Sequence, residues 1–426
     1  MVHERTRMMK IRSLTGFGKV VESFFSLSLM YGIDLILPLI TMPYLMRIIG
    51  IEKVGLLSFV AATNAYFSII INYGFTLTAT KEVAIHSQNP RELQQIFNKV
   101  TTSKFYLALF SFLLLLIIVL AFSDFRAHYG LYGIVFCGIF FQSFLPIWFF
   151  QGLQNLKRIT LQNGLIKIIF TALIFVFVKK ESDYWKVPTF NTAAFFFCAV
   201  LAYYYLFTHY RLRFLWSEFQ DVKYQLKEGL YVFLSQVKIS FFSSFNVLML
   251  GLLVGNVAVG YFTAADKIVR ALAVIQIPIT ASLYPHFSQL LRTDKYMAYR
   301  QINKIGYGAI AFYIPILLLT FVFSHLIAEV VFGVGADEIS LLIRIMVPLP
   351  LLIILNNLAG TQMLLNMGKD KWFFNILLST AVLNVCMVIP LTKIWGFEGT
   401  SYSVLISEIY LCAAMYMGFL KVKKIY

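Results

Sequence analysis

The stretch from Gly229 to Pro285, GLYVFLSQVKISFFSSFNVLMLGLLVGNVAVGYFTAADKIVRALAVIQIPITASLYP, decides the fold class of this sequence. It holds two long apolar runs joined by a short turn, from Gly255 to Gly260. Each run exceeds the roughly 20 residues that a helix needs to cross a hydrocarbon layer of about 30 Å. The stretch therefore predicts two membrane-crossing helices connected by a tight turn.

Charged residues interrupt both of these apolar runs. Lys238 lies in the first run, and Asp266, Lys267 and Arg270 lie in the second. A charge at the centre of a membrane costs roughly 2.5–3.5 kcal/mol on insertion scales, so such residues usually face a bundle interior or a watery cavity. We expect this hairpin to form one wall of a translocation pathway.

The composition of the whole chain agrees with a polytopic membrane protein. The 426 residues are 59% hydrophobic and 13% charged, with a mean hydropathy of +0.77, far from the values of soluble domains. Apolar runs such as residues 105–122 lack the alternation of barrel strands, so the spans are predicted to be helices. We predict twelve transmembrane helices, at about 20–49, 54–79, 105–123, 130–151, 160–178, 190–208, 230–254, 261–284, 305–324, 339–365, 373–392 and 399–419.

The distribution of basic residues predicts the orientation. Segments on the side of the amino terminus carry 25 Lys and Arg residues, whereas the opposite segments carry 7. The positive-inside rule then places both termini in the cytoplasm. This asymmetry accounts for most of the net charge of +16, so we expect no nucleic-acid partner. The four cysteines lie in apolar runs and the six histidines are scattered, so no metal site and no cofactor is expected.

An internal repeat is visible in two pairs of motifs. The motif G-x-x-x-V-G occurs at Gly50–Gly55 and again at Gly255–Gly260, an offset of 205 residues. The motif Q-x-x-x-N occurs at Gln151–Asn155 and again at Gln362–Asn366, an offset of 211. Two ordered matches at a similar offset indicate a duplication. Because each half has an even number of spans, the halves are predicted to be parallel repeats.

The duplication predicts two pseudo-symmetric six-helix lobes, residues 1–209 and 210–426, around a central cavity. Asp34 and Lys238 precede the two glycine motifs by 16 and 17 residues, so they lie at matched depths. We expect them to face one another or to share one cavity. The alternative is that Lys238 extends its long stem to the interface while Asp34 caps the chain locally.

The remaining charges within the spans have two interpretations each. Asp266 and Arg270 are four residues apart on one helical face and can pair. They form either a self-neutralising structural pair or, together with Lys267, a cationic site for a phosphate-bearing ligand. Arg47, near a span end, is either an interfacial anchor or a coupling or gating residue. Glu408 has no obvious partner, and it either hydrogen-bonds within its bundle or couples transport to protons.

Four stretches carry a resemblance to a known family. MPYLMRIIGIEKVGLLSF (42–59), INYGFTLTATKEVA (71–84), GYFTAADKI (260–268) and PITASLYPHFSQL (278–290) resemble the O-antigen and polysaccharide-unit flippases. These belong to the larger multidrug/oligosaccharidyl-lipid/polysaccharide exporter superfamily. The likeness covers nearly the whole chain, including the number of spans and the lengths of the loops.

The resemblance implies two lobes around a cationic cavity that opens alternately to cytoplasm and periplasm. It implies a location in the bacterial inner membrane and a substrate that is an undecaprenyl-diphosphate-linked oligosaccharide. Lys238, Asp266 and Arg270 fall on the two helices that line the cavity in relatives. A polysaccharide polymerase and a chain-length regulator are further expected partners, beside the membrane lipids. The lipid II flippases of the superfamily carry two helices more than the twelve predicted here, which argues against lipid II itself as the expected substrate.

Two other functions compete with this expectation. A cation-coupled multidrug antiporter of the same superfamily would use acidic residues, for which Asp34 and Glu408 are candidates. A membrane glycosyltransferase or polysaccharide polymerase would need paired carboxylates or a metal motif and a large periplasmic loop. The sequence offers neither, so we expect a transporter and no enzyme.

Overall fold

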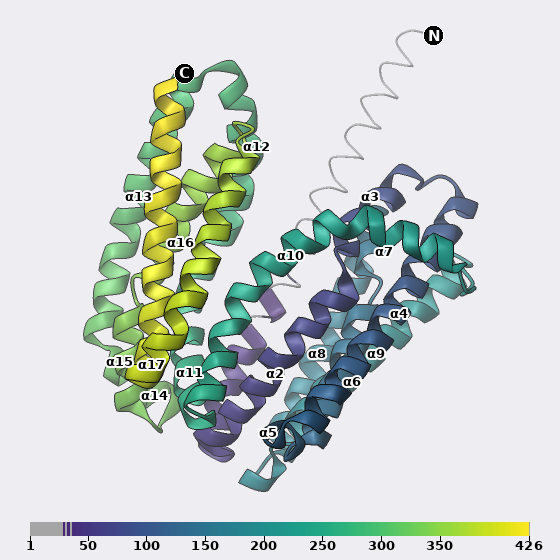
Figure 1. The fold of residues 1–426 in the computed structure, drawn as a ribbon, viewed down its shortest axis with the longest axis horizontal. Coiled ribbons are helices and arrows are strands. Elements are labelled where there is room, and N and C mark those ends of the chain that lie inside the picture. The colour runs from purple at the N-terminus through teal and green to yellow at the C-terminus, as the bar shows by residue number, and fades with distance from the viewer. Residues whose placement is uncertain (1–28, 30–31, 35, 426) are drawn as a thin grey trace. The chain divides into compact units, whose positions relative to one another are not determined.

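The computed structural model of the protein describes residues 29, 32–34 and 36–425, and all structural statements concern these residues. Within helices, the side chains of residues 231, 235–243, 278, 281 and 423–425 also lie outside the description. The described part of the chain is helical and contains no β-strand (Figure 1). The helical elements after residues 36–48 are α2 (Gly50–Asn72), α3 (Phe75–Ile85), α4 (Pro90–Ala121), α5 (Ser123–Arg126), α6 (Tyr129–Phe144), α7 (Ile147–Gly152), α8 (Lys157–Phe177), η1 (Glu181–Asp183), α9 (Lys186–His209), α10 (Phe219–Leu253), α11 (Asn256–Val274), α12 (Gln276–Thr293), α13 (Lys295–Val322), α14 (Ser324–Phe332), α15 (Ala336–Met346), α16 (Leu349–Asn357), η2 (Leu358–Leu365) and α17 (Asp370–Ile425).

Eight helical segments of the described chain are long and apolar enough to cross a membrane. The predicted all-α membrane architecture is therefore confirmed, whereas the count of twelve spans stays a prediction. Several predicted spans are broken in the structure. The second divides into α2 and α3 at Tyr73 and Gly74, which have φ of 44° and 80°. The fourth divides into α6 and α7 at Pro146, which has no backbone N–H to continue a helix.

Other spans are longer than predicted. α4 begins at Pro90, 15 residues before the predicted start of the third span. The side chain of Asn89 caps this helix by accepting hydrogen bonds from the backbone N–H groups of Arg91 and Glu92. Proline at the first helical position is favourable because its missing N–H would have no partner there. These local signals start the helix early and join a predicted loop to a predicted span.

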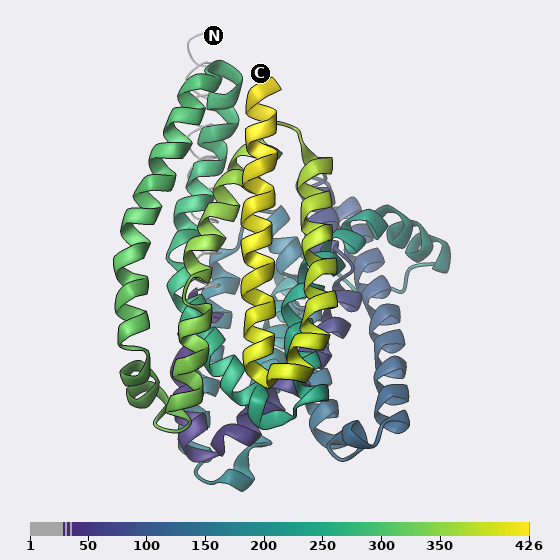
Figure 2. The same cartoon turned by 60° about the vertical axis from the view of Figure 1, so that its left-hand side comes forward.

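The last two predicted spans form α17, which is bent at Gly396. Gly396 has φ 57° and ψ −130°, a conformation that glycine adopts without the steric cost of a side chain. Figure 2 shows the two halves of α17 side by side. The amide nitrogen of Asn384 joins them by donating to the hydroxyl groups of Ser403 at 3.1 Å and Ser407 at 3.2 Å.

The chain divides into two compact units. The first unit comprises the described residues up to Pro38 and Thr63–Val237, and its core contains the fully buried Phe75, Phe97 and Phe149. The second unit comprises Leu39–Ala62 and Lys238–Tyr426. Its core contains Phe287, Met363 and Phe419 among others. The limits of these units differ from the predicted lobes, 1–209 and 210–426, which stay a prediction about the duplicated halves.

Within the second unit, the two copies of the glycine motif meet each other. A Cβ atom added to Gly55 would lie 1.8 Å from the carbonyl oxygen of Asn256, and one added to Gly260 would lie 2.5 Å from that of Ile51. The hydroxyl oxygens of Ser58 and Thr263, 205 residues apart, lie 3.4 Å from each other. Equivalent positions of the repeat thus contact each other, and the helices α2 and α11 touch backbone to backbone within their first two turns.

Candidate functional site

A cluster of ionisable side chains in the second unit combines residues from three helices. On α11, the Arg270 Nε donates to both carboxylate oxygens of Asp266, at 2.8 Å each, so the pair predicted from the spacing forms. From α16, the Asn356 side-chain amide donates to Glu408 Oε2 of α17 at 2.7 Å. Arg270 and Glu408 attract each other electrostatically. We call Asp266, Arg270, Asn356 and Glu408 the charged cluster.

The guanidinium group of Arg270 is the part of the charged cluster that can bind a ligand. Its side chain is 46% exposed. Only its Nε makes a hydrogen bond to another described residue, so four of the five guanidinium N–H donors have no acceptor there. Two parallel N–H groups of this kind match the oxygens of a phosphate or carboxylate. The arrangement can therefore hold an oxyanion while Asp266 fixes the plane of the guanidinium.

The formal charges of Asp266, Lys267, Arg270 and Glu408 can be compared. Asp266 and Glu408 carry two negative charges, and Arg270 and Lys267 carry two positive charges. Glu408, for which the sequence suggested no partner, is hydrogen-bonded to Asn356 and near Arg270. The four groups together are formally neutral. Their roles in binding or coupling stay predictions.

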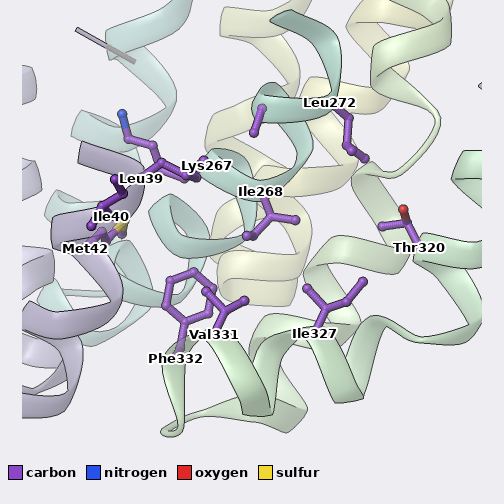
Figure 3. A pocket seen from close by; sticks show the side chains of 11 residues that line it. Leu39, Ile40, Met42, Lys267, Ile268, Leu272, Thr320, Ile327, Val331 and Phe332 are labelled. Carbon is purple, nitrogen blue, oxygen red and sulfur yellow. The ribbon is translucent and has the colours of Figure 1, made fainter. Parts of the chain in front are cut away.

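Lys267 stands apart from the charged cluster. It lies next to Asp266 on α11, but it has no ion pair or hydrogen-bond acceptor among the described residues. Its stem lines a pocket of the second unit, and its nitrogen points away from the apolar side chains there (Figure 3). It is therefore a cation available to an external group.

In the first unit, Asp34 pairs with a partner that the sequence analysis did not predict. Lys167 of α8 donates from its Nζ to Asp34 Oδ1. The same ammonium lies 5.4 Å from the centre of the Phe195 ring. The predicted partner, Lys238, lies on α10, and its side chain is outside the described residues. The proposed facing of Asp34 and Lys238 therefore stays a prediction, while Asp34 is already neutralised within the first unit.

Lys104 is a buried amine that lies one residue before the start of the third predicted span. Its side chain is almost fully buried in α4. Its Nζ donates to the carbonyl oxygen of Ser143 at 2.6 Å and to Asn72 Oδ1 at 3.2 Å. Both of these acceptors are neutral dipoles. Position at the start of an apolar run made Lys104 indistinguishable from an interfacial residue.

Arg47 binds the end of a helix. Its guanidinium donates to the carbonyl oxygens of Val330, Val331 and Phe332, the last residues of α14. Carbonyl groups at a helix carboxyl end have no intrahelical partner, and a cation there also opposes the helix dipole. The structure thus gives Arg47 a capping contact within the second unit, and its coupling or gating role stays a prediction.

Among the described residues, no group of three or more metal-ligating side chains comes together.

Comparison with known proteins identifies the family. The sequence profile of the polysaccharide biosynthesis protein family matches residues 20–291. The chain belongs to this family. The "Putative O-antigen transporter" of Escherichia coli (strain K12) is 29% identical to this chain over 398 residues. The alignment covers 92% of this chain and 94% of the relative.

Solved structures show the same fold at low identity. The lipid II flippase MurJ in an inward closed conformation superposes with a TM-score of 0.71 at 13% identity, covering 94% of this chain and 87% of that one. An inward-facing multidrug resistance MATE family transporter of the MOP superfamily gives a TM-score of 0.70 at 14% identity, covering 91% and 94%. This member of the polysaccharide biosynthesis protein family therefore shares the fold of these solved transporters, and eight helical segments of its described residues are long and apolar enough to cross a membrane.

Proposed function

We propose that the protein is a flippase for undecaprenyl-diphosphate-linked O-antigen or a related polysaccharide repeat unit. It moves this lipid from the cytoplasmic to the periplasmic leaflet of the bacterial inner membrane, with both of its own termini in the cytoplasm. The name of the Escherichia coli relative supports the substrate class, and the excess of basic residues on one side supports the orientation.

The observation that carries this proposal is the exposed guanidinium of Arg270, which lies within the predicted span 261–284. Four of its donors meet no acceptor among the described residues, while Asp266 holds it in place. A charged group within a membrane span is costly, and such groups usually face a water-filled cavity and mark a substrate pathway. The diphosphate of a lipid-linked sugar supplies the oxygens that these donors lack.

The transport cycle follows from the cost of moving a charged, hydrated headgroup through hydrocarbon. A polar cavity that opens alternately to either side lowers this barrier, because the headgroup never leaves a polar environment. The duplicated halves, 1–209 and 210–426, would rock against each other around the bound headgroup. A polysaccharide polymerase and a chain-length regulator would receive the delivered unit.

The test is a deletion strain that makes the lipid-linked repeat unit but lacks this protein. We expect repeat units to accumulate on the cytoplasmic leaflet and surface polysaccharide to disappear, and we expect a plasmid-borne copy to reverse both. Leaflet location is measured by access of a membrane-impermeant lectin in inverted and right-side-out vesicles. Unchanged surface polysaccharide in a strain with no second flippase would contradict the proposal.

A second candidate is a cation-coupled multidrug antiporter. The two carboxylates of the charged cluster, Asp266 and Glu408, favour it because they could hold a cationic drug or a coupling ion. Drug resistance conferred in an efflux-deficient host, and lost in Glu408→Ala, would support this candidate. We expect no such resistance, because the carboxylate of Asp266 is already paired with the guanidinium of Arg270.

A further inference from the structure

A pocket of about 430 Å³ lies within the second unit. Its walls come from helical residues 36–48, α11, α13 and α14, and Met42, Ala271 and Phe332 are among the residues that line it (Figure 3). The volume falls within the range of roughly 300–1,000 Å³ that is usual for small-ligand sites. The pocket is therefore large enough for part of a lipid chain.

Only two of the residues that line the pocket have polar side chains, Lys267 and Thr320. The Thr320 hydroxyl donates to the carbonyl oxygen of Ile316 at 2.8 Å, so its donor is already used. The Lys267 ammonium lies beyond the apolar lining and has no acceptor among the described residues (Figure 3). A matching ligand has a hydrocarbon body and one anionic end.

Such a ligand has two sources, a membrane phospholipid and the transported lipid. Lys267 lies six residues after the start of the predicted span 261–284, which is about 9 Å along a helix axis. That is about a third of a hydrocarbon layer of roughly 30 Å. A membrane phospholipid keeps its phosphate in the headgroup region, outside this layer. A lipid whose headgroup is being carried through the membrane brings its phosphate to the predicted depth of Lys267, so we assign the ligand to the transported lipid.

We propose that the pocket holds the first isoprenoid units of the transported lipid while Lys267 binds its phosphate. This inference rests on the proposed function and adds a location for the hydrocarbon chain. Lipid tails outside the protein are as apolar as the pocket, so the pocket contributes position rather than hydrophobic affinity. It keeps the chain beside α11, so that the phosphate stays within reach of Lys267.

The experiment uses the full-length protein in nanodiscs of phosphatidylethanolamine and phosphatidylglycerol. The probe is a polyprenyl monophosphate with a diazirine near its phosphate end, and the labelled peptides are identified by mass spectrometry. We expect labelling of α11, α13 or α14. Lys267→Gln should lower it by about tenfold, the change that corresponds to one lost hydrogen bond between charged groups.

Matched variants separate charge from shape. Ala271→Phe fills the pocket and should lower labelling at least as much, and Ala271→Leu serves if the larger variant does not fold. Lys393→Gln and Ala311→Phe alter exposed residues of the same unit that do not line the pocket, and they should label like the wild type. If both Lys267→Gln and Ala271→Phe label as strongly as the wild type, the proposal is overturned.

Two further outcomes assign the source of the ligand. A phosphatidylglycerol probe with the same diazirine should label the pocket at least tenfold less, and equal labelling would overturn the assignment to a transported lipid. The probe has no sugar, so its binding is independent of the repeat unit. If Lys267→Gln loses labelling but the deletion strain keeps its surface polysaccharide, the flippase proposal is refuted and the pocket proposal stands. If the pocket is not labelled but the protein complements the deletion, the pocket proposal is refuted and the flippase proposal stands.

Discussion

The first two turns of α2 and α11 are alike, whereas the following turns of the same two helices differ. Within the first two turns, Gly55 and Gly260 bring the two backbones into contact. Further along, α11 carries Asp266 and Arg270 where the repeat-equivalent positions of α2 carry Ala61 and Ala65. A backbone contact accepts only glycine in both copies, because any side chain would collide. A charged site needs to be built only once, so the copies are free to diverge there.

Breaking the contact between the repeats should have the largest effect. Gly55→Ala places a methyl group 1.8 Å from the backbone oxygen of Asn256, so α2 and α11 must separate. We expect a loss of at least about 3 kcal/mol in the free energy of unfolding, beyond usual overpacking. Gly260→Ala should act in the same way because the contact is reciprocal. Thermal unfolding in detergent measures both.

Gly306→Ala is the matched control for this prediction. Gly306 lies within α13, and a Cβ atom there would meet no atom within 4 Å. Replacing a helical glycine by alanine in open space should stabilise the protein by roughly 0.5–1 kcal/mol. If Gly55→Ala and Gly306→Ala shift the unfolding midpoint in the same direction, the two repeats do not touch as described.

Arg47 sharpens the comparison because its repeat equivalent is Leu252. Arg47→Gln removes the cation from the end of α14 and should cost about 1.5–3 kcal/mol, the value of hydrogen bonds to a charged group. Arg126→Gln, which removes one bond to the carbonyl oxygen of Leu120, should cost less. The unfolding midpoints of the two variants provide the measurement. An equal loss in both would mean that the three carbonyl contacts of Arg47 contribute no more than one.

The charged cluster should affect transport more than stability. Arg270→Gln removes the open donors and should lower surface polysaccharide at least tenfold, about 1.4 kcal/mol of binding. It should change the free energy of unfolding by less than about 1 kcal/mol, since exposed ion pairs contribute little. Moving the pair into the first repeat, as Ala61→Asp with Ala65→Arg, should not rescue Arg270→Gln. Rescue would show that the two copies are interchangeable.

Glu408→Gln should have the smallest effect on stability. The amide oxygen of glutamine can still accept the hydrogen bond from Asn356, so we expect a change below about 0.5 kcal/mol. Transport that persists in Glu408→Gln but fails in Glu408→Ala would assign this residue to hydrogen bonding. Transport that fails in both would assign its charge to coupling.

Local patterns in the sequence predicted local features of the structure. The spacing of four residues predicted the pair of Asp266 and Arg270, because neighbours on a helix face are fixed by its pitch. The glycine motifs predicted a repeat, and the structure brings its two copies together. Apolar runs predicted the membrane helices because the thickness of hydrocarbon sets their length.

Contacts between distant segments could not be predicted from the sequence. Asp34 and Lys167 are 133 residues apart, and Arg47 and Phe332 are 285 apart. No periodicity encodes such pairs, since they depend on how whole helices pack. Lys104 illustrates the same limit: its neutral partners, Asn72 and the Ser143 carbonyl, become visible only once three helices are assembled. The roles of Lys238 and Lys267 likewise depend on surroundings that one chain segment does not determine.

The assignment of Leu39–Ala62 to the second unit has a consequence for biosynthesis. Gly55 reaches the membrane early, but its partner Gly260 is synthesised 205 residues later. At the usual 5–20 residues per second, this delay lasts about 10–40 s. Throughout that interval the glycine edge of α2 lies uncovered in the bilayer or against the insertion machinery. A truncated chain that stops before Gly255 should therefore be a preferred target of membrane proteases.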